Sequence, residues 1–224
     1  MSEQTKSNLV VMCDFDGTIT EDDVCLALLK HFAGDGWQRL EDEYEAGRIS
    51  LETCLVGQVD MLGAPRAEMA VWACRHARLR PGFGDFVAFC QRQEVPFLIV
   101  SAGLDFYIDA ILRREGLAGI HVTCIATDLA GDRVKVRLPL AGYADLAGLA
   151  DFKEVIVREQ QARGRGVVYV GDGSTDFLAA SQADHVFARA KLLAYCQRHA
   201  LTCRPYETFA DIQRGLEELL GGEV

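Results

Sequence analysis

Residues 9–20, LVVMCDFDGTIT, pass from an apolar run directly into two aspartates. The apolar part, residues 9–13, is typical of a buried β-strand, and Asp14 and Asp16 follow it with one residue between them. Because strand side chains alternate between faces, both carboxylates are expected to point the same way from the strand end. Two like charges this close repel each other unless a cation, a shared proton or a chemical role stabilises them.

The composition limits the classes of protein to consider. The chain has 224 residues, of which 50% are hydrophobic and 25% charged, which suits one domain or a core with a smaller insert. Its net charge of −10 argues against nucleic-acid and anionic-membrane partners, because both need a basic face. Without a long apolar run or a signal-peptide core, the sequence predicts a cytoplasmic protein, and its eight cysteines are expected to be reduced thiols.

Short apolar runs alternate with helical patterns along the chain. Strands are predicted at residues 9–13, 95–100, 167–170 and 185–187, with a hairpin across residues 120–138 that turns at Ala-Gly-Asp. Near-continuous apolar strands are typical of a parallel sheet that is covered on both faces. The predicted fold is therefore α/β, with a doubly wound parallel sheet.

Helices are predicted between these strands, at residues 81–94, 150–164 and 207–220. Pro81 suits the first turn of the first helix, because proline lacks the amide hydrogen that is unused there. Asp151 is the expected N-cap of the second, whose buried stripe is Phe152, Val155 and Ile156.

A long insert interrupts the alternation. From residue 21 to residue 79 the pattern is helical, with no strand signal. The insert leaves just after the acidic pair and returns just before the next strand, which places it over the carboxyl ends of the strands, where open α/β sheets bind ligands. We predict an α/β core of residues 1–20 and 80–224 and a helical cap of residues 21–79.

Polar residues also end the other predicted strands. Residues 98–103, LIVSAG, carry Ser101, and residues 167–176, VVYVGDGSTD, carry two further aspartates, while a lysine begins the helix between them. The carboxyl ends of parallel strands meet at one edge of the sheet. The topology is thus expected to collect six side chains in one crevice: Asp14, Asp16, Ser101, Lys153, Asp172 and Asp176.

Taken singly, each of these residues has an ordinary structural explanation. An aspartate at a strand end usually caps a turn or a helix, and Lys153 alone is most simply a solvated side chain. Four aspartates in order, with the flanking glycines and the lysine, favour a functional site instead. The histidines show no metal-ligand spacing, and no C-x-x-C pair suggests a zinc site.

With DFDGT at residues 14–18, GDGSTD at 171–176, the strand-end serine and the helix-start lysine, the chain resembles haloacid-dehalogenase-type phosphatases. The resemblance implies a haloacid-dehalogenase-like Rossmannoid core, and the helical insert is similar to that of the phosphoserine-phosphatase-like branch. Residues 80–108 and 185–212 further resemble the bacterial methionine-salvage phosphatases, which act on 2-hydroxy-3-keto-5-methylthiopentenyl-1-phosphate. The function that this implies is magnesium-dependent hydrolysis of a small phosphomonoester.

The resemblance also implies catalytic roles. Asp14 would be the nucleophile that forms an aspartyl-phosphate, and Asp16 would protonate the leaving oxygen and then take a proton from water. Lys153 would offset the charges of the phosphate and the nucleophile.

Ligand-binding roles follow from the same resemblance. Ser101, with the amides of Ala102 and Gly103, and Lys153 would bind the phosphate. The Mg²⁺ site would comprise four aspartates: the Asp14 carboxylate, the Asp16 carbonyl and Asp172 as ligands, and Asp176 holding a metal-bound water.

Phosphoserine is the alternative substrate. Asp23 stands where phosphoserine phosphatases carry a cap glutamate for the substrate amine, so it is a candidate cap contact. Val56 falls near the position of their cap arginine, which leaves a substrate carboxylate without its bidentate partner. The methionine-salvage family has a cysteine-rich stretch before the lysine, whereas residues 141–153 here, AGYADLAGLADFK, contain no cysteine.

Two other classes stay open at the level of sequence. The same residues would serve a phosphotransferase, and a catalytically silent binding protein could use the same scaffold, although the intact acidic set argues against the latter. The expected partner is a small phosphate ester, and a homodimer is compatible with the sequence. Lys30, Arg39 and Arg48 are the cap cations considered as partners for an anionic substrate.

Overall fold

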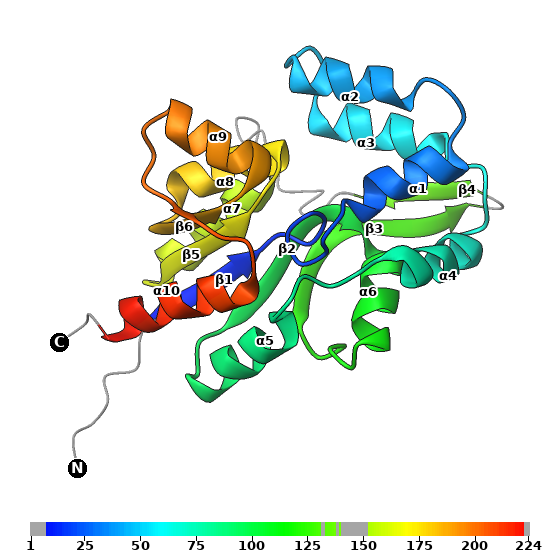
Figure 1. Ribbon diagram of the computed structural model, residues 1–224. Helices are drawn as coiled ribbons and strands as arrows, with labels where there is room; N and C mark the ends of the chain where they lie inside the picture. The colour runs from blue at the N-terminus through cyan, green and yellow to red at the C-terminus, as the bar shows by residue number, and fades with distance from the viewer. Residues whose placement is uncertain (1–7, 131–132, 138, 140–151, 222–224) are drawn as a thin grey trace.

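The computed structural model describes residues 8–130, 133–137, 139 and 152–221. Its strands form one seven-stranded sheet in the order β4-β3-β2-β1-β5-β6-β7 (Figure 1). Neighbouring strands are parallel, except for the antiparallel pair β3 and β4. This arrangement confirms the predicted α/β fold. The strands are β1 Leu9–Cys13, β2 Phe97–Leu104, β3 His121–Ala130, β4 Arg133–Arg137, β5 Gly166–Gly171, β6 His185–Ala188 and β7 Arg204–Pro205.

Helices cover both faces of the sheet, and β1 lies between them. Leu9, Val11 and Cys13 pack into one core with three helices, α5 (Phe83–Arg92), α6 (Asp105–Arg114) and α10 (Phe209–Gly221). Val10 and Met12 face the opposite core with α7 (Phe152–Ala162), α8 (Phe177–Gln182) and α9 (Ala190–Arg198). All five side chains of β1 are therefore buried, which explains why this strand is apolar at every position.

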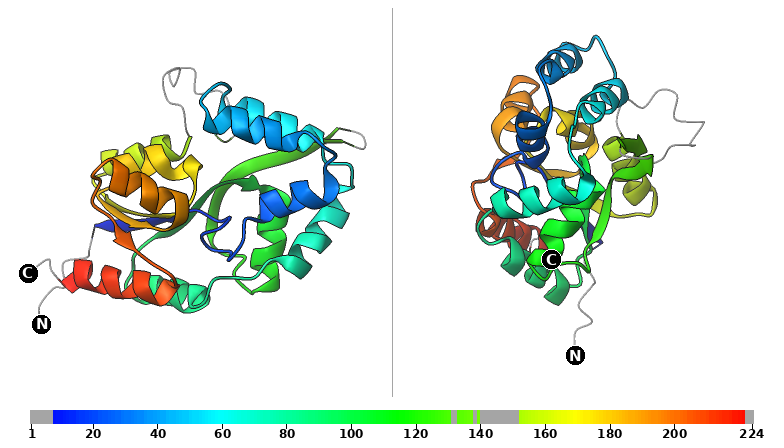
Figure 2. Two further views of the ribbon diagram at one scale, coloured as in Figure 1. Left: turned by 45° about the horizontal axis from the view of Figure 1, so that its top comes forward. Right: turned by 90° about the vertical axis from the view of Figure 1, so that its right-hand side faces the viewer.

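The insert after β1 is helical, as its sequence pattern predicts. It contains α1 (Val24–Phe32), α2 (Trp37–Glu45), α3 (Leu51–Asp60) and α4 (Arg66–His76). Between two residues of the segment 21–79, all of which are described, the only β-type contact is a single bridge that joins Ala33 and Leu62. Helix α4 packs on α6, and α3 packs on the edge strand β4. Figures 1 and 2 place α2 and α3 on the side of the molecule away from α5 and α10.

The two ends of the insert lie next to each other. Thr20 and Leu79 form an antiparallel bridge. The Glu21 amide donates to the Arg78 carbonyl at 2.9 Å, and the Arg80 amide donates to the Ile19 carbonyl at 2.7 Å. The chain thus leaves the sheet and returns to it through one short paired crossing.

Several predicted boundaries were wrong by a few residues, among them those of α5, β2 and α10. Helix α5 begins at Phe83 rather than at Pro81, because Gly82 adopts φ +84° as its N-cap residue and interrupts the helical path. Strand β2 continues through Ser101 to Leu104, with an irregular register against β3 between Val100 and Leu104. Strands β3 and β4 confirm the predicted hairpin strands, whereas the turn residues Gly131 and Asp132 and the proposed cap Asp151 lie outside the described residues.

The eight cysteines are free thiols, as predicted. Four are buried, namely Cys13, Cys54, Cys90 and Cys196, and they pack as small apolar side chains. Among the described residues, no helix combines the length and the apolar character that a membrane span needs.

Candidate active site

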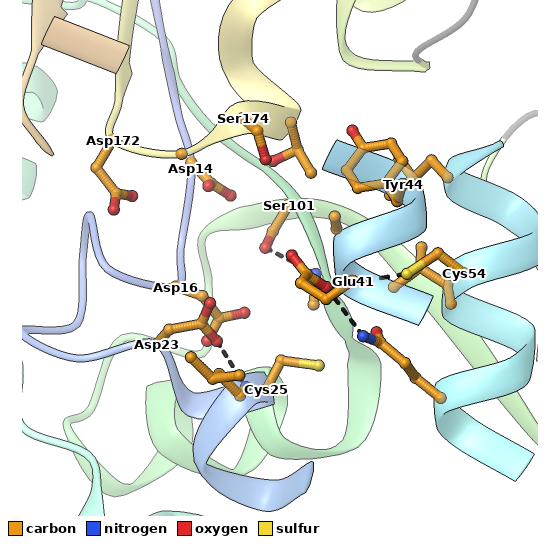
Figure 3. A pocket seen from close by; sticks show the side chains of 18 of the residues that line it. Asp14, Asp16, Asp23, Cys25, Glu41, Tyr44, Cys54, Ser101, Asp172 and Ser174 are labelled. Atoms are coloured by element: carbon orange, nitrogen blue, oxygen red, sulfur yellow. Dashed lines mark hydrogen bonds between the residues drawn. The ribbon is translucent and has the colours of Figure 1, made fainter. Parts of the chain in front are cut away.

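The ends of β1, β2 and β5 bring most of the predicted residues together (Figure 3). Strand β1 lies between the other two, and the Asp14 amide donates to the Val170 carbonyl at 2.9 Å, which holds the end of β1 against β5. Asp14, Asp16, Ser101 and Asp172 all line one cavity of about 330 Å³. The common edge of the parallel strands therefore acts as the floor of this cavity, as expected for an open α/β sheet.

Lys153 is fully buried between two carboxylates. Its Nζ lies 3.0 Å from Asp14 Oδ1 and 2.7 Å from Asp176 Oδ1, and it donates to Thr175 Oγ1 at 3.1 Å. A buried ammonium is stable only where anions and acceptors replace its lost hydration, and this position supplies both. The lysine predicted to begin a helix lies in the first turn of α7 and joins the β1 and β5 motifs.

Asp176 is held by hydrogen bonds to both of its oxygens. Its Oδ2 accepts from the amides of Asp172 and Gly173 at 2.9 Å each, and its Oδ1 accepts from Tyr169 Oη at 2.8 Å as well as from Lys153. These bonds fix the GDGSTD loop, since they tie Asp172 and Gly173 to Asp176 at its end.

Asp172 approaches the loop after β1. Its Oδ1 accepts a hydrogen bond from Thr18 Oγ1 at 2.8 Å. Gly17 passes so close that an added Cβ would lie 2.5 Å from Asp172 Oδ2, and its φ of +70° is itself in the region that favours glycine. The glycine of DFDGT is thus explained by both its conformation and its neighbour.

Asp16 connects the floor of the cavity with the insert. Its Oδ1 accepts from the amide of Val24, the first residue of α1, at 3.1 Å, and its Oδ2 accepts from Tyr107 Oη. Burial, followed by the charge of Asp23, raises the pKa of Asp16 to about 8 despite these two hydrogen bonds. An added Cβ at Gly103 would overlap the Tyr107 hydroxyl and the Asp16 carboxylate, so this second glycine makes room for the contact.

The carboxylates at the floor share a strained electrostatic environment. Burial, together with the charge of Asp176, raises the pKa of Asp14 well above its ordinary value, although Lys153 opposes the shift. The same two causes raise the pKa of Asp172 to about 6. Asp14, Asp172 and Asp176 each offer an oxygen within 4.8 Å of the others. A cation between these hard oxygen donors would relieve the repulsion, which is the arrangement that Mg²⁺ prefers.

Ser101 is completely buried at the floor, and its Oγ accepts a hydrogen bond from the Gly103 amide at 3.0 Å. This bond leaves the serine hydroxyl hydrogen for another acceptor. Ala102 and Gly103 also line the cavity, so three of the four predicted phosphate-binding residues lie there, whereas the fourth, Lys153, is not among the described lining residues.

The insert and α9 form the rest of the cavity wall. Asp23, the predicted cap contact, lines the cavity and caps α1 by accepting from the Leu26 amide at 2.7 Å. None of the three cap cations considered from the sequence, Lys30, Arg39 and Arg48, is among the described lining residues. The lining cation is Lys191 of α9. Its ammonium pairs with Glu45 of α2.

Arg80 was not identified from the sequence, although it contacts the whole loop after β1. Its guanidinium donates to the carbonyls of Gly17 and Thr18 at 2.8 Å each, of Thr20 at 3.1 Å, of Glu21 at 3.4 Å and of Glu207 at 3.3 Å. Arg189 donates to the Gly17 carbonyl at 2.8 Å from the other side. Tyr107 and Glu41 were missed as well, because contacts between distant residues leave no local pattern in the sequence.

Comparisons with known proteins identify the relatives of the chain. The family described as haloacid dehalogenase-like hydrolase matches residues 11–181. A protein of Geobacillus kaustophilus named 2-hydroxy-3-keto-5-methylthiopentenyl-1-phosphate phosphatase is 36% identical over 214 residues, covering 94% of this chain and 96% of its own length. The protein of the same name from Geobacillus thermodenitrificans is 34% identical over 220 residues, covering 96% of this chain and 98% of its own.

Solved structures share the fold at lower sequence identity. A phosphoserine phosphatase described as a phospho-aspartyl intermediate analogue has a TM-score of 0.70 and 18% identity, covering 93% of this chain and 99% of its own. A hydrolase of Salmonella enterica serovar Typhi has a TM-score of 0.69 and 17% identity, and the match covers 91% of this chain and 69% of the hydrolase. These structures show the fold alone. The sequence matches confirm the predicted class of phosphomonoester hydrolase and show that the chain belongs to the haloacid dehalogenase-like hydrolase family.

Proposed function

We propose that this protein is a Mg²⁺-dependent phosphatase that hydrolyses 2-hydroxy-3-keto-5-methylthiopentenyl-1-phosphate, or a closely related small phosphate ester, through an aspartyl-phosphate. The similarity to phosphatases of that name over 94% and 96% of the chain supports the substrate. The observation that carries the mechanism is the Asp14 carboxylate, which lines the cavity 3.0 Å from the fully buried ammonium of Lys153.

Asp14 acts as the nucleophile in this proposal. The Phe15 amide donates to its Oδ1 at 2.8 Å, and Lys153 contacts the same oxygen, so the carboxylate has a fixed orientation. Its attack on phosphorus forms the aspartyl-phosphate and releases the ester oxygen. The Ser101 hydroxyl and the amides beside it, with Lys153, stabilise the charge on the phosphoryl oxygens.

Asp16 acts as the acid and then the base. Tyr107 and the Val24 amide hold its carboxyl group at the cavity floor, between Asp14 and the insert. From there it gives a proton to the leaving oxygen and takes one from the water that hydrolyses the aspartyl-phosphate.

The donor set fits a magnesium ion. Carboxylates of Asp14 and Asp172 and the main-chain carbonyl of Asp16 would hold it, with Asp176 orienting the loop that carries Asp172. When bound, Mg²⁺ supplies positive charge that lowers the repulsion between Asp14 and an approaching phosphate.

The paired crossing at Thr20 and Leu79 supports a division into a core of residues 1–20 and 80–224 and a cap of residues 21–79. The cap side of the cavity, including Asp23, then contacts the organic part of the substrate. Cytoplasmic localisation and a homodimer stay predictions of the sequence.

Phosphate release from a panel of esters tests the proposal. The panel contains the methylthiopentenyl ester, O-phosphoserine, glycerol 3-phosphate and sugar phosphates, each with Mg²⁺ and with a chelator, and Asp14→Asn is the control for contamination. We expect Mg²⁺-dependent release that is fastest with the methylthiopentenyl ester and absent in the folded variant. Fastest release from O-phosphoserine would assign the alternative substrate. No release above the Asp14→Asn background would reject the phosphatase mechanism.

A further inference from the structure

The wall of the cavity that faces the catalytic carboxylates is apolar and acidic. Four leucines from α1 and α3 line it, namely Leu26, Leu29, Leu51 and Leu55. Asp23 from the start of α1 and Glu41 from α2 add two carboxylates to the same wall. A bound phosphate ester would place its phosphate at the floor and its organic part against this wall.

Glu41 is held in position by its neighbours. Its Oε2 accepts a hydrogen bond from Gln58 Nε2 at 2.9 Å, and the Cys54 thiol donates weakly to the same oxygen at 3.9 Å. Gln58 is only 3% exposed, so it is a fixed donor rather than a mobile surface side chain. Figure 3 shows Glu41 projecting from its helix into the cavity.

The charge on this wall is not neutralised by an arginine. The described lining residues include none, and Val56, which stands near the position of the substrate-binding arginine in phosphoserine phosphatases, does not line the cavity. The single cation among them, Lys191, already pairs with Glu45. After burial, the charge of Glu41 also raises the pKa of Asp23, against smaller opposing effects of Lys30 and Lys191, so the two carboxylates repel each other.

We propose that Glu41 is a specificity-determining residue that excludes phosphate esters carrying a carboxylate, and that the accepted substrates have an uncharged, largely apolar organic part. This inference rests on the proposed function, because it assumes that the ester binds with its phosphate at the floor. A substrate carboxylate would meet the carboxylates of Asp23 and Glu41, while Lys191, the one cation among the described lining residues, already pairs with Glu45. Repulsion between like charges would therefore weaken its binding. A neutral group would pack on the leucines and donate hydroxyl hydrogens to Glu41.

Binding of two phosphonates that cannot be hydrolysed tests this inference. The pair is 3-hydroxypropylphosphonate and 3-phosphonopropionate, which differ in a terminal hydroxyl or carboxylate, and their Kd values are measured by calorimetry on the full chain with Mg²⁺. We expect the wild-type protein to bind the hydroxyl compound at least about tenfold more tightly. Glu41→Gln, which keeps an acceptor for Gln58, is expected to lower that ratio about fivefold or more, mainly by tighter binding of the carboxylate.

Glu43→Gln is the matched control, because Glu43 lies on the same helix, pairs with Arg48 and does not line the cavity. It should leave the ratio unchanged. Asp23→Asn provides a second variant with the same expected direction, in case Glu41→Gln unfolds. If the ratio of the two Kd values is the same in the wild type and in both cavity variants, the inference is overturned. Tighter wild-type binding of the carboxylate compound also overturns it and would assign Lys191 as the partner of that carboxylate. Failure of both phosphonates to bind also overturns it, whereas the phosphatase proposal is decided separately by phosphate release.

Discussion

Gly17 lies where the loop after β1 passes closest to Asp172. An added methyl group would stand 2.5 Å from the Asp172 carboxylate, so the loop and the carboxylate would have to separate. We expect Gly17→Ala to lower kcat/KM about a hundredfold, the effect of displacing catalytic groups by about 1 Å. Steady-state kinetics measures the loss of activity, and thermal unfolding measures any loss of stability separately.

Gly47 offers a matched control for this change. Its φ is +69°, against +70° for Gly17, but nothing lies within 4 Å of the position of its Cβ. Both alanine variants should lose about 1–2 kcal/mol of stability through the left-handed backbone conformation. Only Gly17→Ala should lose activity; an equal loss in Gly47→Ala would show that backbone strain, and not the contact with Asp172, is responsible.

Lys153 and Lys191 form ion pairs in opposite environments. Lys153 and Asp176 are both 0% exposed, whereas the Lys191 side chain is 62% exposed beside Glu45. Removing a buried partner leaves uncompensated carboxylates, so Lys153→Met is expected to lower the free energy of unfolding by about 3–5 kcal/mol. Lys191→Met should cost less than about 1 kcal/mol. Urea denaturation with a chelator present compares them, and similar losses would contradict the burial argument.

At the scale of elements, Arg80 joins three segments that meet below the site. It donates to carbonyls of the loop after β1, to the first residue of the insert and to Glu207 before α10. Lysine cannot reproduce the planar set of five donors. We expect Arg80→Lys to lower kcat about tenfold or more through displacement of Gly17 and Thr18, and to lower the melting temperature. Exposed Arg78→Lys is the control; unchanged kcat in Arg80→Lys would mean that the loop holds its own position.

Local patterns explain which elements could be predicted. The strands are apolar because both faces of the sheet are covered, and the aspartates follow them because the strand ends share an edge. Contacts between distant residues leave no such periodic signal: Tyr107 lies 91 positions from Asp16, and Arg80 lies 63 from Gly17. The lining role of Glu41 depends on how α2 packs, and its stretch EDEYE is equally typical of a solvated helix face. Specificity was therefore harder to predict than chemistry.

At the scale of the whole molecule, the buried carboxylates lower the stability of the folded state when no metal is bound. The folded-state pKa of Asp172, about 6, lies above its ordinary value of 3.8, so its ionisation disfavours the folded state. With a chelator present, the contribution of Asp172 to stability is therefore expected to fall as the pH rises from about 4 to about 6 and to stay low above that range. Thermal unfolding from pH 4 to pH 8 measures it, and Asp172→Asn should flatten this part of the profile.

Magnesium should reverse that cost, because it binds the folded arrangement of carboxylates and not the unfolded chain. At ten times its Kd, a ligand of this kind stabilises a protein by about 1.4 kcal/mol, which is about 3–6 °C in melting temperature for a chain of this size. In Asp172→Asn, whose amide oxygen still accepts from Thr18, we expect a higher melting temperature without metal and no rise with Mg²⁺ at pH 8. Asp128→Asn, on the exposed side of the β3 and β4 hairpin, should keep the wild-type response. If Mg²⁺ raises the melting temperature of Asp172→Asn as much as that of the wild type, the ion binds elsewhere. The closeness of the carboxylates of Asp14, Asp172 and Asp176 would then need another explanation.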